Sequence, residues 1–298
     1  MHKDYQSRCK AQGSCKRHAS GDAKGIIALD LDGTLLNSKK ELSDRNLQAL
    51  HKAYEAGWEI VPTTGRFYNG MPEAIRQLPF VRYIITINGA EAADIKTGEV
   101  IYKAEMPWKK AVEIMEWLDD KDVIYDCYMR NHGWMTAAQK ELIDEVVESP
   151  HSRKMLHELR NPVDELKAFL KEEKHDIQKV QFFMRDVSGR PKIMKQLAEE
   201  FEGIVVSSAL PQNVEINEIH ANKGEALMAL ADHLGLSREQ TISFGDGLND
   251  LPMIRDAGIG ICMENGAPEV KAAADWIAPT CDEDGVAVGI EKFIPDCE

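Results

Sequence analysis

One short run near the start of the chain constrains the fold more than any other feature. Residues 25–29 read Gly-Ile-Ile-Ala-Leu, and the run ends at Asp30. A short stretch that is apolar at every position is typical of a strand buried on both faces, as in a parallel sheet covered by helices on each side. The run therefore predicts a buried strand of an α/β protein.

The alternation of strand and helix recurs toward both ends of the chain. Ser43 is a suitable N-cap for a helix that carries Leu47, Leu50 and Tyr54 on one face and stops at Gly57. Further strands and helices are expected at 58–61, 71–77, 83–87, 227–234, 241–244, 248–256, 259–262, 268–274 and 276–277. This pattern predicts a doubly wound, Rossmann-like parallel sheet.

The middle of the chain has a different texture, because its strands tend to come in neighbouring pairs with helices interposed. These strands are expected at 123–129, 134–137, 179–185, 204–210 and 213–219. Asn161-Pro162 offers a cap and a first-turn proline for a helix that carries Leu166 and Leu170, and another helix is expected over 111–118. We therefore expect an inserted α+β domain at 90–217, a core made of 22–89 and 218–298, and a disordered basic extension at 1–21.

Composition limits the classes of partner. The formal net charge of −14 argues against a nucleic-acid-binding protein, since phosphate backbones are bound by basic surfaces. No apolar run approaches the roughly 20 residues of a membrane span, and the start of the chain lacks the pattern of a secretory signal. The 6 cysteines form no CxxC pair. We expect a cytoplasmic protein with reduced thiols.

Two carboxylates follow the first strand. Asp30 and Asp32 are two positions apart, so they face the same side if strand geometry persists there, at the sheet edge where α/β proteins bind ligands. Two close carboxylates repel, and this calls for a shared proton or a bound cation, of which Mg²⁺ best suits oxygen ligands. The alternative is a simple acidic turn, with Thr34 as the cap of a following helix.

Three more strand or helix junctions carry polar groups of the same kind. Thr64-Gly65 offers a hydroxyl and accessible backbone amides, and Lys223 places a cation at the start of a helix, where an anion is favoured. Gly245-Asp246-Gly247-Leu248-Asn249-Asp250 adds carboxylates after another buried strand. Each alone is explained by turn chemistry or solvation, but all are expected at one edge of the sheet.

The motifs DLDGT, TTGR, NKG and GDGLND, in this order and with a large insertion, resemble the haloacid dehalogenase superfamily, and within it the Cof-type phosphatases with a type IIB cap. The resemblance spans about residues 24–290. It implies that Asp30 attacks phosphorus and that Asp32 carries the proton, for which Asp32 needs a raised pKa. A second acid at the position of Asp32 is similar to phosphatases and phosphomutases and differs from dehalogenases.

The same resemblance implies two sets of ligands. The phosphate would be held by Thr64, Gly65, Lys223, Asn249 and the backbone amide of Leu31. Mg²⁺ would be held by the Asp30 carboxylate, the Asp32 carbonyl, Asp246 and Asp250. Asn88 and Arg66 are further candidates for contact with the substrate, although a hinge turn explains Asn88 equally well and a surface role suits Arg66 better.

We therefore expect a Mg²⁺-dependent phosphatase of small phosphorylated metabolites, such as sugar phosphates, that works as a monomer or a small homo-oligomer. Two alternatives stay open. A phosphomutase would return the phosphoryl group to another hydroxyl of the same sugar. A non-catalytic regulatory protein would keep the fold and sense a phosphorylated ligand without turning it over.

Overall fold

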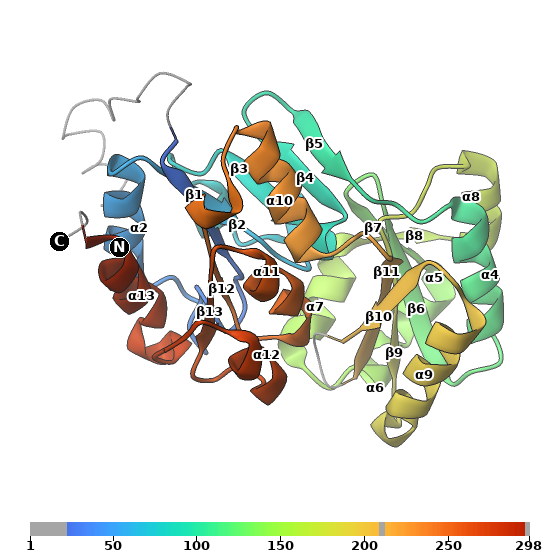
Figure 1. The fold of residues 1–298 in the computed structure, drawn as a ribbon. Helices are drawn as coiled ribbons and strands as arrows, with labels where there is room; N and C mark the ends of the chain where they lie inside the picture. The colour runs from blue at the N-terminus through green and yellow to red at the C-terminus, as the bar shows by residue number, and fades with distance from the viewer. Residues whose placement is uncertain (1–22, 209–211, 296–298) are drawn as a thin grey trace.

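The computed structural model describes residues 23–208 and 212–295 (Figure 1). The expected basic extension at 1–21 lies outside these residues. Among the described residues, no helix is long and apolar enough to cross a bilayer.

A five-stranded parallel sheet forms the core, with the strand order β14-β13-β12-β1-β2. This confirms the predicted α/β fold, and the first and last parts of the chain both contribute strands. The strands are β1 (Gly25–Leu29), β2 (Trp58–Pro62), β12 (Thr241–Gly245), β13 (Ile259–Met263) and β14 (Trp276–Ala278). Because β1 and β12 are neighbours and run in the same direction, Asp30 and Asp246 follow them at the same edge.

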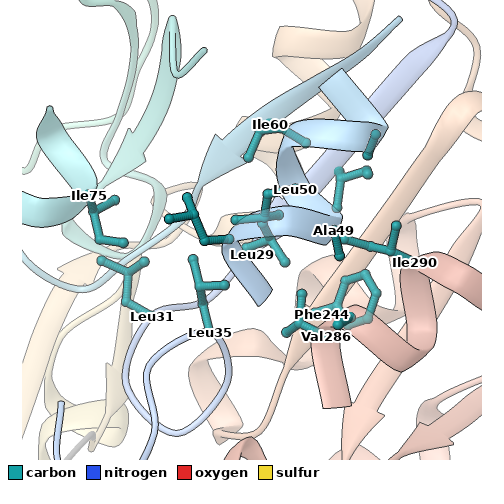
Figure 2. Packing of buried hydrophobic residues seen from close by; sticks show 14 of the residues in the cluster. Leu29, Leu31, Leu35, Ala49, Leu50, Ile60, Ile75, Phe244, Val286 and Ile290 are labelled. Carbon is teal, nitrogen blue, oxygen red and sulfur yellow. The ribbon is translucent and has the colours of Figure 1, made fainter. Parts of the chain in front are cut away.

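Strand β1 is buried on both faces, as its unbroken apolar run predicts. Ile27 and Leu29 belong to the cluster on one side, and Ile26 and Ala28 belong to the cluster on the other. Figure 2 shows the first of these clusters, in which Leu29 lies close to Leu50. The helices on this side are α2 (Asp44–Glu55) and α13 (Gly285–Phe293), and those on the other are α10 (Lys223–His233) and α11 (Leu251–Asp256).

The predicted ends of α2 are confirmed. The Ser43 side chain accepts a hydrogen bond from the Asn46 backbone N at 3.1 Å, and Gly57 has a φ of +99°. A hydroxyl cap satisfies a free amide of the first turn, and a left-handed glycine directs the chain into β2. The remaining core helices are α3 (Glu73–Arg76) and α12 (Pro268–Ala273).

A small antiparallel sheet lies beside the core sheet and is formed by β3 (Tyr83–Thr86), β4 (Glu91–Asp94) and β5 (Glu99–Lys103). Strand β3 continues the core sheet through isolated parallel bridges, among them Thr63 with Ile85. Strands β4 and β5 pack against α10, where Ala92 joins the same apolar cluster as Leu227. The expected start of the inserted domain at residue 90 stays a prediction. The hairpin of β4 and β5 follows residue 90 in the sequence but packs against α10 of the core.

The inserted region forms a six-stranded mixed sheet in the order β10-β11-β9-β6-β7-β8 (Figure 1). Its strands are β6 (Val123–Met129), β7 (His132–Thr136), β8 (Arg160–Val163), β9 (Lys179–Met184), β10 (Ile204–Ser207) and β11 (Asn213–Glu218). Its helices are α4 (Trp108–Leu118), α5 (Ala137–Glu141), α6 (Ile143–Val146), α7 (Pro150–Leu159), α8 (Leu166–Glu173) and α9 (Arg190–Glu200). Helices α4, α8 and α9 cover one face of the sheet. We call this sheet the cap sheet.

One local prediction in this region is wrong. Asn161 and Pro162 do not cap a helix but belong to β8, which pairs in parallel with β7. Helix α8 begins instead after Glu165, without a side-chain cap. Since β8 is an edge strand of the cap sheet, the missing N–H of Pro162 is tolerated there.

Candidate active site

Three carboxylates meet at the carboxyl edge of the core sheet. Asp30 follows β1, Asp246 follows β12, and Asp250 ends a short 3₁₀ helix at Leu248–Asp250. Each offers one oxygen, and these three oxygens lie within 4.8 Å of one another. The structure thus brings together three of the four residues expected to hold a metal by their side chains or backbone.

Lys223 joins this cluster from the first turn of α10. Its Nζ donates to Asp30 Oδ1 at 2.7 Å and to Asp250 Oδ1 at 2.5 Å, and the side chain is fully buried. The α10 N-cap is Asn222, whose side chain accepts from the Glu225 backbone N at 2.9 Å. Because the helix begins there, a short segment fixes both the lysine and the positive end of the helix dipole at the site.

The cluster carries more negative charge than Lys223 neutralises. Burial raises the pKa of Asp30 well above its usual value, Asp250 raises it further, and Lys223 opposes both. Burial, with Asp250 again, raises the pKa of Asp246 to about 6. Three converging oxygens with an unbalanced charge are the donor set of a hard divalent cation, so these residues fit Mg²⁺.

The backbone around the cluster is shaped for close approach. Asp250 Oδ2 accepts hydrogen bonds from the backbone N of Asp246 and of Gly247, each at 2.9 Å. Thr34 Oγ1 donates to Asp246 Oδ1 at 3.1 Å. Gly33 has a φ of +93°, and a Cβ there would lie 2.5 Å from Asp246 Oδ2. The glycine of DLDGT therefore allows the loop after β1 to touch the loop after β12.

Asp32 does not share the environment of Asp30. Arg66 donates to both of its oxygens, from Nε to Oδ2 and from Nη2 to Oδ1 at 2.9 Å each, and Lys40 Nζ lies 3.0 Å from Oδ1. Burial alone would raise the pKa of Asp32, but the two cations lower it below its usual value. The expectation of a raised pKa is therefore wrong for this conformation, because the sequence did not reveal these partners.

The second predicted motif closes another side of the site. The Thr64 backbone N donates to Ile85 O at 2.9 Å, and the Thr64 carbonyl accepts from the Asn88 N at 3.0 Å. A Cβ on Gly65 would lie 2.7 Å from Asn88 Oδ1. That same oxygen accepts from Asn249 Nδ2 at 3.2 Å. The structure therefore gathers Thr64, Gly65, Asn88 and Asn249 around one point.

The side chain and the backbone of Leu31 have different surroundings. Its side chain is fully buried in the apolar cluster on the α2 side, where Figure 2 shows it near Leu35 and Ile75. Its carbonyl accepts from the Leu36 backbone N at 2.8 Å. Contact of its backbone amide with phosphate stays a prediction.

Sequence reasoning missed the residues that the cap sheet contributes. Lys179 Nζ donates to the carbonyl of Gly65 at 3.0 Å, and Asn88 Nδ2 donates to Glu215 Oε2 at 2.6 Å. The signal was a period of two: polar residues at 179 and 181, and at 213, 215 and 217, alternate with apolar residues that pack under α4, α8 and α9. A strand of a half-exposed sheet has the same pattern, so it does not identify a site by itself.

The family model of the haloacid dehalogenase-like hydrolases matches residues 27–290. Among curated proteins, the chain is 29% identical to 5-amino-6-(5-phospho-D-ribitylamino)uracil phosphatase YcsE of Bacillus subtilis, over 90% of this chain and 95% of that protein. It is 28% identical to pyridoxal phosphate phosphatase YbhA of Escherichia coli, over 88% and 96%.

Solved structures show the same fold. A haloacid dehalogenase-like hydrolase from B. subtilis superposes with a TM-score of 0.79 at 28% identity, covering 91% of this chain and 100% of that one. The subclass IIB sugar phosphatase BT4131 superposes with a TM-score of 0.75 at 23% identity, covering 90% and 98%. The chain belongs to the haloacid dehalogenase-like hydrolases and is a phosphatase of that family, with the fold of the subclass IIB enzyme BT4131.

Proposed function

We propose that this phosphatase hydrolyses monoesters of small phosphorylated metabolites through an aspartyl-phosphate formed on Asp30. The observation that carries the proposal is the position of Asp30, whose carboxylate is held by Lys223 at 2.7 Å beside Asp246 and Asp250. Lys223 holds Oδ1, which leaves Oδ2 to attack phosphorus. Nucleophilic carboxylates of this kind divide one difficult displacement into two easier ones.

In the first step the Asp30 Oδ2–P bond forms and the ester P–O bond breaks. Asp32 gives its proton to the departing alcohol oxygen. In the second step water attacks the same phosphorus, the Oδ2–P bond breaks, and Asp32 accepts the proton of the water. Free phosphate and an unmodified Asp30 result, so protons and bonds balance over the cycle.

Lys223 and the backbone at the sheet edge would stabilise charge on the phosphoryl oxygens. Thr64, Gly65, Asn249 and the Leu31 amide are the other groups that we assign to the phosphate. Asp30, Asp246, the Asp32 carbonyl and Asp250 would hold Mg²⁺, whose positive charge would keep the Asp30 nucleophile ionised. Asp250 also orders this loop through its hydrogen bonds to the backbone of Asp246 and Gly247.

Asp32 must leave its present partners before it can carry a proton. Arg66 occupies both carboxylate oxygens and lowers the pKa, which favours the ionised form. We assign the exchange of this contact to substrate binding, in which the leaving oxygen approaches Asp32 and Arg66 moves to the organic part of the substrate. Arg66 and Asn88 therefore stay our candidates for substrate contact.

The names of the relatives support the proposed substrate class. Their names cover a phosphorylated ribitylaminouracil and pyridoxal phosphate, which are small monoesters with different leaving groups. We propose a substrate of this general class, sugar phosphates included, and action in the cytoplasm as a monomer or a small homo-oligomer.

A panel of monoesters tests the function. Purified protein should release phosphate from 4-nitrophenyl phosphate and from some of a set of sugar, nucleotide and cofactor phosphates, with Mg²⁺ and not with EDTA. Asp30→Asn should lose this activity and still unfold in a single cooperative thermal transition. Absence of Mg²⁺-dependent release from every monoester would exclude the proposal, and a hexose 6-phosphate formed from a hexose 1-phosphate would indicate a mutase.

A further inference from the structure

An ion pair on the cap sheet reaches across to the core. Lys179 begins β9 and Glu215 lies in β11, and both side chains are buried. Lys179 Nζ lies 2.8 Å from Glu215 Oε1, donates to Gly65 O at 3.0 Å, and stands 4.4 Å from the centre of the Tyr128 ring. A carboxylate, a carbonyl and an aromatic face thus surround one ammonium group.

Glu215 continues the connection with its second oxygen. Oε2 accepts from Asn88 Nδ2 at 2.6 Å, and Asn88 Oδ1 accepts from Asn249 Nδ2 at 3.2 Å. The hydrogen bonds therefore form an unbroken series from the cap sheet to Asn88 after β3 and to the loop after β12. Together with the Lys179 contact, the pair reaches two loops that we assign to phosphate binding.

The backbone of Ile87 and Asn88, which the cap sheet contacts, is strained. Asn88 has a φ of +58° and Ile87 a φ of +54°, and a β-branched residue rarely adopts this region. Such a conformation persists where the surroundings hold it. The cap sheet contributes to this, because Asn217 Nδ2 donates to Ile87 O at 3.4 Å while Glu215 holds the Asn88 side chain.

The contacts of Lys179 and Glu215 suit a role in positioning Gly65 and Asn88 better than a role in binding a ligand. An ammonium has three N–H donors, and those of Lys179 face the three groups named above. Burial alone would lower the pKa of Lys179, but Glu215 and Tyr128 raise it above its usual value, so the charge is retained. A pair that merely stabilised the cap sheet would need no contact with Gly65 and Asn88.

We propose that Lys179 and Glu215 are positioning residues of the phosphatase: they set the carbonyl of Gly65 and the side chain of Asn88, and through them the phosphate-binding loops. The expected effect on kcat rests on the proposed function. The expected effect on structure, which is that the pair keeps the two loops ordered, does not depend on that function.

The kinetic test uses Lys179→Met, Lys179→Arg and Glu215→Gln in the full chain. Lys179→Met should lower kcat for the best monoester of the panel by about 100-fold, as expected when reacting groups are misplaced by about 1 Å. Lys179→Arg keeps the charge and should recover most of this loss, and Glu215→Gln should show a loss of the same sign. Lys171→Met removes the exposed Lys171–Glu116 pair of the same region, 3.2 Å long, and should leave kcat unchanged.

The structural test measures backbone amide hydrogen exchange at 64–66 and 87–89. Exchange should rise there in Lys179→Met and Glu215→Gln but not in Lys171→Met. If the wild type hydrolyses nothing in the panel, the proposed function fails while this measurement still decides on the pair. Unchanged exchange in folded Lys179→Met, or unchanged kcat in an active enzyme, overturns the proposal; should Lys179→Met not fold, Glu215→Gln decides by the same two readings.

Discussion

Arg66 holds both carboxylate oxygens of Asp32, with Nε and Nη2 at 2.9 Å each. A planar guanidinium that donates two parallel hydrogen bonds is among the strongest partners of a carboxylate. Arg66 also donates from Nη1 to Gly70 O at 3.1 Å, which fixes its direction. In this arrangement the intended proton carrier is ionised, so proton transfer and movement of Arg66 are linked.

Replacement of Arg66 tests this link. Arg66→Met should raise the pKa of Asp32, because Lys40 is then the remaining nearby cation of the two that lower it. The pKa can be measured by NMR titration of the carboxyl carbons. Arg76→Met is the control, since Arg76 donates to Met71 O and stands over the Tyr68 ring. An Asp32 pKa that is the same in wild type and Arg66→Met would contradict the assigned role of the ion pair.

The lowered pKa of Asp32 has a consequence for stability. The unfolded chain takes up this proton near pH 3.8, the ordinary pKa of an aspartate, and the native state takes it up at lower pH. Stability from Asp32 is therefore fully present above about pH 5 and is lost as the pH falls through the native pKa. In urea unfolding, Arg66→Met should lose less stability than the wild type between pH 4 and pH 3.

Lys223→Met should destabilise the fold strongly at pH 7.5. Removing the buried cation leaves the carboxylates of Asp30 and Asp250 unpaired, for which a cost of roughly 3–5 kcal/mol is typical. Lys271→Met, which removes the surface pair with Glu264, should cost less than about 1 kcal/mol. The deficit of Lys223→Met should shrink at pH 5, because the carboxylates then take up protons. A deficit that is equal at both pH values in urea unfolding would argue against unpaired charge as its cause.

Magnesium should stabilise the native state in a pH-dependent way. The pKa of Asp246 is raised to about 6, so the native metal-free protein binds a proton between about pH 4 and 6 that the unfolded chain lacks. Its stability therefore falls as the pH rises through this window. Mg²⁺ at 100 times its Kd should add about 2.7 kcal/mol at pH 7.5, and clearly less at pH 5 for the same Mg²⁺ concentration.

Calorimetric or urea unfolding with and without EDTA measures this gain. Asp246→Asn should abolish most of it, since one of the three converging carboxylates is then lost. An equal Mg²⁺ gain in wild type and Asp246→Asn would place the cation elsewhere.

Gly89→Ala should be more harmful than an ordinary substitution of a left-handed glycine. Gly89 has a φ of +94°, and a Cβ there would lie 2.2 Å from Asn222 O and 2.9 Å from Lys223 N. Gly98 has a φ of +77° with nothing within 4 Å of such a Cβ, so Gly98→Ala isolates the backbone cost of about 1–2 kcal/mol. Urea unfolding should show the larger loss for Gly89→Ala, with lower phosphatase activity because Lys223 shifts. Equal losses of stability in the two variants would mean that the contact between Gly89 and Asn222 adjusts to a Cβ without cost.

Much of the core followed from local patterns. The apolar run that ends at Asp30 predicted β1 to within one residue, and parallel strands then required Asp30 and Asp246 to meet at one edge. The Ser43 cap is likewise a local feature, since its partner is three residues away. Where the physical cause lies within a few residues, or follows from the direction of neighbouring strands, sequence reasoning was sufficient.

The predictions that were wrong or missing concern residues that are far apart in the sequence and meet only in the folded chain. Asn161-Pro162 has the local form of a helix start, but pairing with β7 at the edge of the cap sheet prevailed. The pKa of Asp32 is set by Arg66, which is 34 residues away in sequence. Lys179 and Glu215 lie on neighbouring strands in which polar and apolar residues alternate, and their contact with the core depends on how the cap sheet is placed. A local sequence pattern cannot predict partners that come together only in the folded chain.

The contact between Gly89 and Asn222 also bears on how the cap sheet was accommodated in the chain. All six of its strands lie between these two residues, yet the backbones on either side are in van der Waals contact. To the core, the intervening segment is a loop whose ends already meet, and the entropy of closing such a loop grows only slowly with its length. The core can therefore accommodate a long insertion where Gly89 meets Asn222 with little added entropic cost.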